Sequence, residues 1–450
     1  MKSFVTIFLT LTGLVFAQQS GSRMAPVKFS DTTLENGLRV IISEDHFAPV
    51  FAIAVCYKAG SRDEHEGRTG FAHLFEHMMF KGSENVGPGE HFYDIFTKGG
   101  NMNGATTTDR TMFYEELPKN QVDLALYLEA DRMRSLVITK ENLDNQRQAV
   151  KEERRQSLDN QPYGKTSEKI DGLIYDNFAN QHSVIGSMAD LDAATVDDVK
   201  QFFKTYYAPN NAVLVMAGDL DTKETLAKVK KYFAAIPRQP APKPADLTEP
   251  EQTEERRGRL EDSLARVPRL EIAYRIPGAN NQDTRALGEA ASILGLGESS
   301  RLYQKLVREK QIALQVGCLE DARSGPSTFR VVAFIRPGTS PQDVENLIAE
   351  EISRLVAEPV SDKELERVHS AIRRSIPASR ESMLSIAVTL ADDAALYDDP
   401  NRINTENEKR LAITPADIQK AAKTWLRNSN RVVVVTEPAA KPGASAPKQQ

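Results

Sequence analysis

The most constraining feature of this 450-residue chain is that its second half repeats its first. In each half, a helix-like segment that opens on a Thr leads into a short apolar run, at 212–216 in the first half and 432–435 in the second. The positions that match at a constant offset of 219 (414 − 195) are Thr195 and Thr414, Tyr206 and Trp425, and Asn211 and Asn430. A chain that repeats itself once at this spacing is expected to fold as two copies of one unit.

A second pair of segments repeats at nearly the same spacing. The sequence TKENLDNQRQAVKEERR starts at Thr139 and SDKELERVHSAIRRS starts at Ser361, an offset of 222 (361 − 139). Ser or Thr followed by acidic residues is a usual start of an α-helix. Apolar runs at 38–42 and 51–57 predict neighbouring strands. The expected fold class is therefore mixed α/β (α+β), with two tandem homologous domains, each a sheet covered by helices.

The two copies are separated by a stretch that cannot build a core of its own. Residues 236–262 read IPRQPAPKPADLTEPEQTEERRGRLED, which is rich in Pro and charge and poor in apolar side chains, as expected of a linker. The domains are therefore predicted at 25–235 and 263–436. By the same compositional argument, residues 437–450 are predicted to be a disordered tail.

The N-terminus resembles an export signal. Lys2 precedes an apolar run at 4–16, and Ala17 ends a sequence that resembles a cleavage site, so residues 1–17 are predicted to be a signal peptide. We expect an exported protein, periplasmic or secreted after cleavage near Ala17; an uncleaved membrane anchor is the alternative. No later stretch is long and apolar enough for stable membrane insertion. The net charge of −6, without a basic block, argues against a nucleic-acid partner.

The residues with the clearest chemical meaning lie at 69–82, TGFAHLFEHMMFKG, where Thr69 is placed to cap a helix. His73 and His77, at positions i and i+4, project from one helical face with Cβ atoms ~5–6 Å apart. Both imidazoles can then reach one Zn²⁺ at ~2.0–2.1 Å. Glu76 shares this face, where it can take a proton from a water held by the metal. The alternative is a surface His pair that is salt-bridged to a Glu.

A catalytic zinc site needs a third protein ligand, and helix periodicity selects Glu153. The residues on one stripe of the predicted helix 140–157, at spacings of 3, 4 and 3, are Leu143, Gln146, Val150 and Glu153. The matching stripe of the second half is apolar, which indicates that the stripe faces inward. A carboxylate there costs several kcal/mol to bury unless it is paired or metal-bound, whereas Glu152 lies with the polar residues. The second half has Ser375 at the matching position and no H-x-x-E-H, so we expect one zinc per chain.

These features together resemble the pitrilysin/insulinase family of zinc metallopeptidases. HLFEH at 73–77 is followed, further along the first half, by Glu153 in AVKEERR. Further stretches of the family type are NGLRVIISED at 36–45, YKAGSRDE at 57–64, GGNMNGATTTDRTMFYEEL at 99–117, YAPNNAVLVMAGDL at 207–220 and SSRLYQKLVREKQIA at 299–313. The short form with two homologous domains is similar to the mitochondrial processing peptidase subunits and their bacterial relatives.

The resemblance implies a zinc-dependent endopeptidase that hydrolyses peptides or unfolded protein segments. His73, His77 and Glu153 would hold Zn²⁺, and Glu76 would be the general base. The residues that match the edge strand on which this family lays its extended substrate are Asn103, Gly104, Ala105 and Thr106. The family usually has Asn-Ala where this chain has Asn-Gly, and a plain hairpin turn is the alternative for this run. The same fold also serves as non-catalytic scaffold subunits in hetero-oligomers, although the four intact site residues argue against that alternative.

The resemblance also implies a partner, through a departure from the family. Active members place an Arg and a Tyr from the second half over the substrate, in a stretch that resembles R-E-K-x-G-L-A-Y. Here Arg308 is present as a predicted substrate-binding residue, but Leu314 stands near the Tyr position and the stretch is one residue shorter. Either Tyr303 or a water substitutes, or a second subunit supplies the missing group. We expect a heterodimer with a metal-free homologue, with a homodimer as the next alternative.

Overall fold

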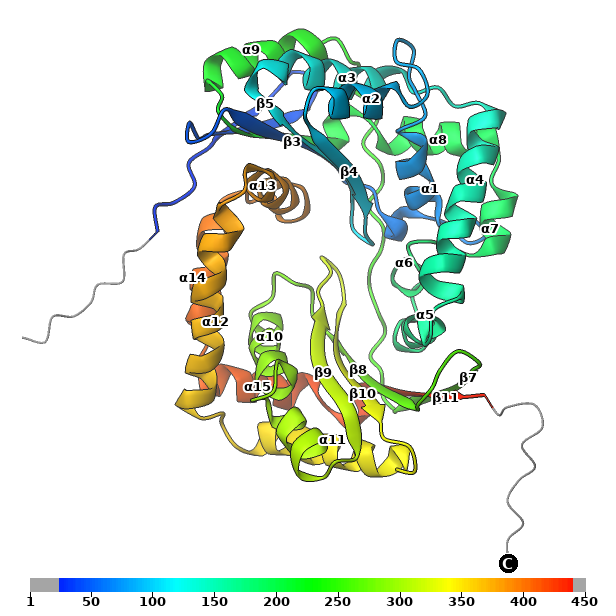
Figure 1. Ribbon diagram of the computed structural model, residues 1–450, viewed down its shortest axis with the longest axis vertical. Coiled ribbons are helices and arrows are strands. Elements are labelled where there is room, and N and C mark those ends of the chain that lie inside the picture. Colours follow the sequence, from blue (N-terminus) through cyan, green and yellow to red (C-terminus); the bar gives the residue numbers. More distant parts are fainter. Residues whose placement is uncertain (1–23, 440–450) are drawn as a thin grey trace, which may run out of the picture.

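The computed structural model describes residues 24–439, so the predicted signal peptide and residues 440–450 of the predicted tail lie outside the described residues. Two β-sheets with their helices form the upper and lower parts of the molecule in Figure 1. The strands are β1 (Ser30–Thr33), β2 (Arg39–Glu44), β3 (Val50–Tyr57), β4 (Asn101–Thr106), β5 (Thr111–Pro118), β6 (Ala212–Gly218), β7 (Arg256–Asp262), β8 (Arg269–Ile276), β9 (Ala313–Asp321), β10 (Ser327–Ile335) and β11 (Arg431–Pro438). The helices are α1 (Phe71–Met78), α2 (Glu90–Thr97), α3 (Val122–Ser135), α4 (Lys140–Arg154), α5 (Gly164–Ile174), α6 (Phe178–Gln181), α7 (Met188–Ala193), α8 (Val196–Tyr206), α9 (Thr222–Phe233), α10 (Gln282–Gly295), α11 (Pro341–Ala357), α12 (Asp362–Arg380), α13 (Met383–Tyr397), α14 (Arg402–Leu411) and α15 (Pro415–Trp425).

The internal repeat of the sequence is a repeat of sheet topology. The first sheet has the strand order β1-β2-β6-β3-β5-β4 and the second has the order β7-β11-β8-β10-β9. Apart from β1, the two orders correspond strand for strand. The first residues of β3 and β8 are related by the same offset of 219 (269 − 50), and so are those of β6 and β11 (431 − 212). The predicted class of two homologous mixed α/β domains is confirmed.

Three details of the prediction are wrong. The predicted disordered tail 437–450 starts too early, because Glu437 and Pro438 are the last two residues of β11 and pair with β7. The last seven residues of the predicted linker 236–262 form β7, which pairs in parallel with β11, so the second sheet begins at Arg256 rather than after the linker. The charged side chains of β7 alternate between exposed and half-buried positions, as on an edge strand, which is why its composition resembles a linker. The strands β2 and β3 are also not neighbours, because β6 lies between them.

The two domains exchange a helix, so their cores cannot be divided at the linker. The inner face of the first sheet is covered by α13 of the second half, through Ile386, Ala387, Leu390, Ala391 and Ala394 (Figure 1). In return, α5 of the first half buries Ile170 and Ile174 against Val432 and Val434 of the second sheet. The exchanged helices also begin at the offset of 219 (383 − 164), so they are equivalent elements of the repeat. Each half therefore completes the core of the other half.

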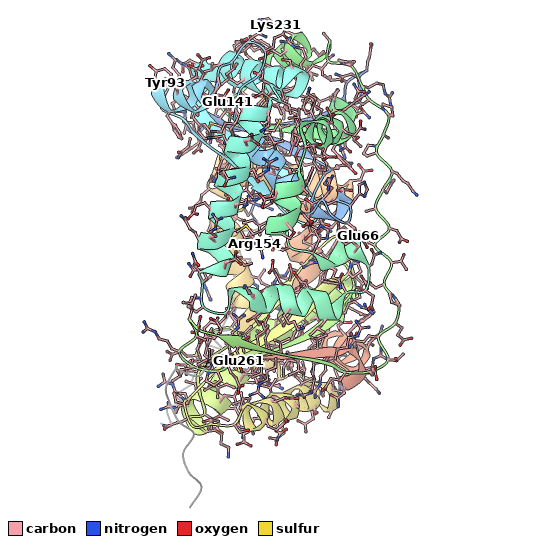
Figure 2. All side chains as sticks on the ribbon, turned by 90° about the vertical axis from the view of Figure 1, so that its right-hand side faces the viewer. Glu66, Tyr93, Glu141, Arg154, Lys231 and Glu261 are labelled. Carbon is pink, nitrogen blue, oxygen red and sulfur yellow. The ribbon has the colours of Figure 1, made fainter. Side chains whose placement is uncertain are left out.

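Figure 2 shows the side of the molecule that α4 and α5 form, turned toward the viewer from the right of Figure 1. Arg154, the last residue of α4, lies at about mid-height between the two sheets. Its guanidinium donates to Glu168 of α5 at 2.8 Å and to the carbonyl of Gly186 at 2.5 Å, which ties α4 to both neighbours. Among residues 24–439, no helix combines the length and the apolar character that crossing a membrane requires.

A candidate metal centre and active site

The H-x-x-E-H sequence lies on α1, a two-turn helix whose N-cap is Gly70 in the left-handed conformation (φ 86°). The predicted cap, Thr69, is therefore wrong by one residue; its hydroxyl donates to Asp190 in the first turn of α7 instead. The helix buries its apolar face in the hydrophobic core of the first domain. Its polar face presents His73 and His77 side by side, with ring centroids 4.8 Å apart.

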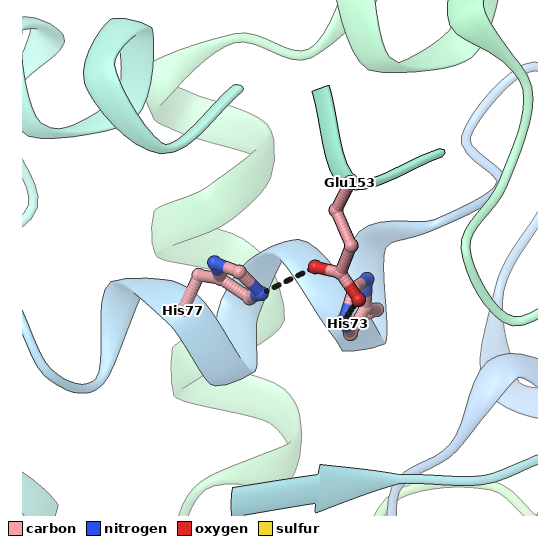
Figure 3. Close-up of side chains that lie close together, drawn as sticks. All are labelled: His73, His77 and Glu153. Atoms are coloured by element: carbon pink, nitrogen blue, oxygen red, sulfur yellow. Dashed lines mark ion pairs between the residues drawn. The ribbon is translucent and has the colours of Figure 1, made fainter. Parts of the chain in front are cut away.

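The third predicted ligand, Glu153, comes from the last turn of α4. Its Oε2 lies 3.2 Å from His77 Nε2 and its Oε1 lies 3.6 Å from His73 Nε2, as Figure 3 shows. A π-helical turn, Arg155–Asp159, follows directly, and such turns are frequent at functional sites. Leu143, Gln146 and Val150 of the same stripe are buried, whereas Glu152 points outward. The structure thus brings together the three residues that the sequence selected as ligands.

The donor set and its electrostatics suit a zinc ion. Two imidazole nitrogens and one carboxylate are a common three-residue zinc set, which leaves one coordination position for substrate or water. Burial and the neighbouring His77 lower the pKa of His73 to about 4, so this imidazole is neutral at pH 7, as a metal ligand must be. The hydrogen bond from His77 holds the pKa of Glu153 below its usual value, and this group is ionised.

Glu76 sits beside the three ligand residues, at the edge of the first sheet. Its carboxylate is buried, and Oε2 accepts a hydrogen bond from the hydroxyl of Thr106 at 2.6 Å. Burial raises the pKa of Glu76, although the Thr106 bond opposes this shift. A Cβ at position 104 would lie 2.9 Å from Glu76 Oε1, so Gly104 leaves the room that this carboxylate fills. Glu76 is thus a buried carboxyl group that lines the cavity, with Oε1 against Gly104 of β4 and Oε2 bonded to Thr106.

The predicted substrate strand is β4, which pairs only with β5 among the described strands and forms one edge of the first sheet. Asn103, Gly104, Ala105 and Thr106 lie on it, which overturns the alternative of a plain hairpin turn. A cavity of about 560 Å³ is lined by this strand, by the three ligand residues and by residues 183–185. An extended peptide on this strand would therefore pass directly by Glu76.

Arg308 is the one predicted site residue that the structure does not bring to this cavity. It lies in the π-helical turn Tyr303–Glu309, where its guanidinium pairs with Glu298 at 2.7 Å and lies over the ring of Tyr303. Leu314 is the extra residue of a β-bulge in β9 and is 47% exposed. Neither residue belongs to the lining of the cavity.

A second cluster of potential metal ligands lies behind β5 and was missed from the sequence. His91 Nε2 lies 2.6 Å from Glu115 Oε1, and Glu129 is paired with Arg132. All four side chains are buried. Burial raises the pKa values of Glu115 and Glu129 to about 7 and lowers the pKa of His91 to about 3, so His91 is neutral at pH 7. The two carboxylates and Arg132 then carry one net negative charge, which a single bound proton neutralises. A divalent ion would leave excess positive charge among these buried side chains, whereas His73, His77 and Glu153 line an open cavity and are the stronger candidates for a metal site.

Sequence reasoning also missed Glu64 and His182, which form an ion pair at 2.9 Å under the first turn of α1. In the sequence, His182 has no neighbouring His or acidic residue at a spacing that would suggest a ligand pair. Glu64 ends the family-type stretch YKAGSRDE, and that was the available signal.

Comparison with known proteins agrees with this class of two-sheet peptidase, in which one half carries the metal motif. A family model described as "Insulinase (Peptidase family M16)" matches residues 39–183, and one described as "Peptidase M16 inactive domain" matches residues 193–372. The chain therefore belongs to the M16 insulinase family of peptidases, in its short two-domain form.

Similar proteins include the zinc protease PqqE of Helicobacter pylori, 26% identical over 415 residues that cover 91% of this chain and 93% of that protein. A probable mitochondrial-processing peptidase subunit beta of Arabidopsis thaliana is 23% identical over 381 residues, which cover 81% and 70% of the two chains. Among solved structures, a protease from H. pylori matches with a TM-score of 0.87 at 26% identity, over 92% of this chain and 100% of that chain. The periplasmic protease PqqL of Escherichia coli matches in fold, with a TM-score of 0.76 at 19% identity, over 92% and 48% of the two chains.

Proposed function

We propose that this protein is a zinc-dependent endopeptidase that hydrolyses peptides or unfolded protein segments. The observation that carries the proposal is the convergence of His73, His77 and Glu153 beside the buried carboxylate of Glu76, in a cavity lined by a free strand edge. The names of the relatives, several of which are zinc proteases, support zinc as the metal. A scaffold subunit is the alternative, and it would need none of these four side chains in this arrangement.

The residues divide the chemistry among them. Bound zinc supplies a Lewis acid that polarises a peptide carbonyl and acidifies a water. Glu76 takes the proton of the attacking water and passes a proton to the leaving amine, and its raised pKa helps it to hold that proton. The Thr106 hydroxyl already donates a hydrogen bond to Oε2 of Glu76, so Oε1 is the oxygen that receives the proton. The open backbone edge of β4 binds an extended substrate with little sequence preference.

The proposal is tested with the purified protein, by metal analysis and by cleavage of an unstructured casein fragment followed by mass spectrometry. We expect one zinc per chain and internal cleavage sites that disappear on chelation and return with added Zn²⁺. A folded protein that carries no zinc, or that carries zinc and leaves a panel of unstructured peptides uncut both alone and after co-expression with a metal-free homologue, would support the scaffold alternative.

Replacing Thr106 by Val should lower kcat about tenfold, with a smaller change in KM. Val keeps the shape of Thr but removes the donor to Glu76, and a hydrogen bond to a charged group contributes ~1.5–3 kcal/mol. The matched control is Thr106→Ser, which keeps the hydroxyl and should stay within about threefold of the wild type. Equal kinetics of the Val and Ser variants would show that Thr106 does not orient the base.

We also propose that a second subunit completes the active site and that the protein works outside the cytoplasm, in the periplasm or secreted. The pairing of Arg308 with Glu298 and the exposure of Leu314 support a missing partner, because neither residue presents a donor to the cavity. The predicted export signal and the likeness to periplasmic PqqL support the location.

The partner is tested by co-expression with a metal-free homologue encoded beside this chain. We expect the homologue to co-purify and to raise peptide cleavage at least tenfold, as an added oxyanion donor would. A lone chain that already cleaves at the rate of the co-expressed sample would rule out a shared site.

A further inference from the structure

The first turn of α1 is capped by a buried carboxylate from outside the helix. Glu64 Oε2 accepts a hydrogen bond from the N–H of Gly70 at 2.8 Å, and its Oε1 accepts one from the N–H of Ala72 at 2.7 Å. The Glu64 side chain is fully buried. The N–H groups at a helix start lack partners within the helix, so this carboxylate satisfies two of them and lies at the positive end of the helix dipole.

His182 supplies the opposite charge. Its Nδ1 lies 2.8 Å from the carbonyl oxygen of Phe178 and its Nε2 lies 2.9 Å from Glu64 Oε2. One proton bridges Nε2 and Oε2, and because both Glu64 oxygens also accept backbone N–H groups, the carboxylate form is favoured and His182 holds the proton. The Phe178 ring stacks on the imidazole with centroids 4.4 Å apart. Glu64 and His182 are therefore a shielded ion pair.

The same pair lies where two walls of the active-site cavity meet. Residues 183–185, which directly follow His182, line the same cavity as the metal ligands. The next residue, Gly186, contacts the start of α1 so closely that a Cβ on it would lie 2.5 Å from Gly70 Cα. A Cβ on Gly70 would in turn lie 2.7 Å from the carbonyl oxygen of Ile185. The start of the metal helix and the cavity wall 183–185, with the adjoining Gly186, thus touch backbone to backbone.

We propose that Glu64 and His182 are positioning residues that hold the metal helix α1 in register with the cavity wall 183–185. The Glu64 carboxylate accepts hydrogen bonds from two N–H groups at the start of the helix. His182 directly precedes the wall 183–185 in the chain, so its bond to Glu64 joins the wall to the helix. Without the pair, His73, Glu76 and His77 would move together relative to Glu153, which comes from a different helix. This inference rests on the proposed peptidase function for its kinetic consequence, but not for its effect on metal binding.

The test compares two substitutions of His182 that differ in which contact they keep. In His182→Gln, the amide nitrogen lies near the former Nε2 and can still donate to Glu64, whereas in His182→Asn it lies near Nδ1 and reaches only Phe178. Zinc affinity is measured by chelator competition, and kcat and KM are measured on one peptide. We expect the Asn variant to bind zinc about tenfold more weakly and to lose about 10–100-fold in kcat with little change in KM. The Gln variant should stay within about threefold of the wild type, and Glu64→Gln should follow the Asn variant.

Two controls separate positioning from stability. His46→Gln removes a surface His–Asp pair of similar length, 2.7 Å from His46 to Asp219. Val344→Ala destabilises the hydrophobic core of the second domain, which does not contain the metal residues. Neither should change zinc affinity. If the Asn and Gln variants bind zinc and turn over substrate alike, or if Val344→Ala weakens zinc as strongly as His182→Asn, the inference is wrong. If no sample cleaves peptides but zinc affinity follows the expected order, the positioning role stands and the peptidase function fails.

Discussion

Replacing Glu76 by Gln is expected to lower kcat by about 10²–10⁴-fold while one zinc ion remains bound per chain. Gln keeps the size of the side chain and can still contact Thr106, but its amide cannot accept the proton of an attacking water. Glu76 is not among the three residues whose ligand atoms converge, so the metal should remain in place. The measurements are zinc content by mass spectrometry and single-turnover cleavage of a fluorogenic peptide.

The same variant separates the peptidase from a scaffold. A catalytic site should lose turnover and keep affinity for the peptide, since the open edge of β4 is unchanged by the substitution. Glu116→Gln is a suitable control, because it replaces a carboxylate on the adjacent strand β5 without touching the metal residues. Wild-type kinetics in Glu76→Gln would remove the general-base role, whereas loss of zinc in that variant would mean that Glu76 is itself a ligand.

The metal site could be predicted because it depends on local geometry. The i, i+4 spacing places His73 and His77 on one face of any helix, and the apolar stripe of α4 identified Glu153 as an acid that needs a partner. The repeat predicted two equivalent sheets for a similar reason, because equivalent strands recur at a fixed offset. Adding the same offset to the first residue of β2 gives a position within β7, so these two strands are also equivalent. The charged composition of β7 hid this equivalence at the level of the sequence.

What could not be predicted depends on contacts between distant segments. The exchange of α5 and α13 leaves no local signal, since each helix is equally apolar whichever sheet it covers. Thr69 is a good capping residue, but Glu64 already satisfies the first N–H groups of α1 from outside, so Gly70 can take the left-handed N-cap position. Arg308 was assigned from a family motif, and its contact with Glu298 could be seen only in the fold.

Replacing Glu153 by Gln should weaken zinc binding by roughly 10²–10³-fold and remove peptide cleavage at limiting zinc. Structural zinc sites with four protein ligands bind with ~10–16 kcal/mol, so one ligand contributes ~2.5–4 kcal/mol, and each 1.4 kcal/mol is tenfold in affinity. A neutral amide also leaves two imidazoles without the negative charge that balances the cation. The measurement is chelator competition, followed by activity at limiting and at saturating Zn²⁺.

The chain offers a closely matched control for this substitution in the neighbouring residue. Glu152 lies on the same helical turn, but it points to solvent and pairs with Arg155 at 3.0 Å. Glu152→Gln changes the net charge by the same amount, so it should leave zinc affinity within about twofold of the wild type, as expected for a screened surface pair. The difference between the two variants therefore measures coordination rather than charge. If the two variants lose zinc affinity equally, the site attracts the ion through its overall negative charge and Glu153 is not a ligand. If neither variant loses zinc affinity, the third ligand lies elsewhere, and Glu153 forms only a structural ion pair with the two histidines.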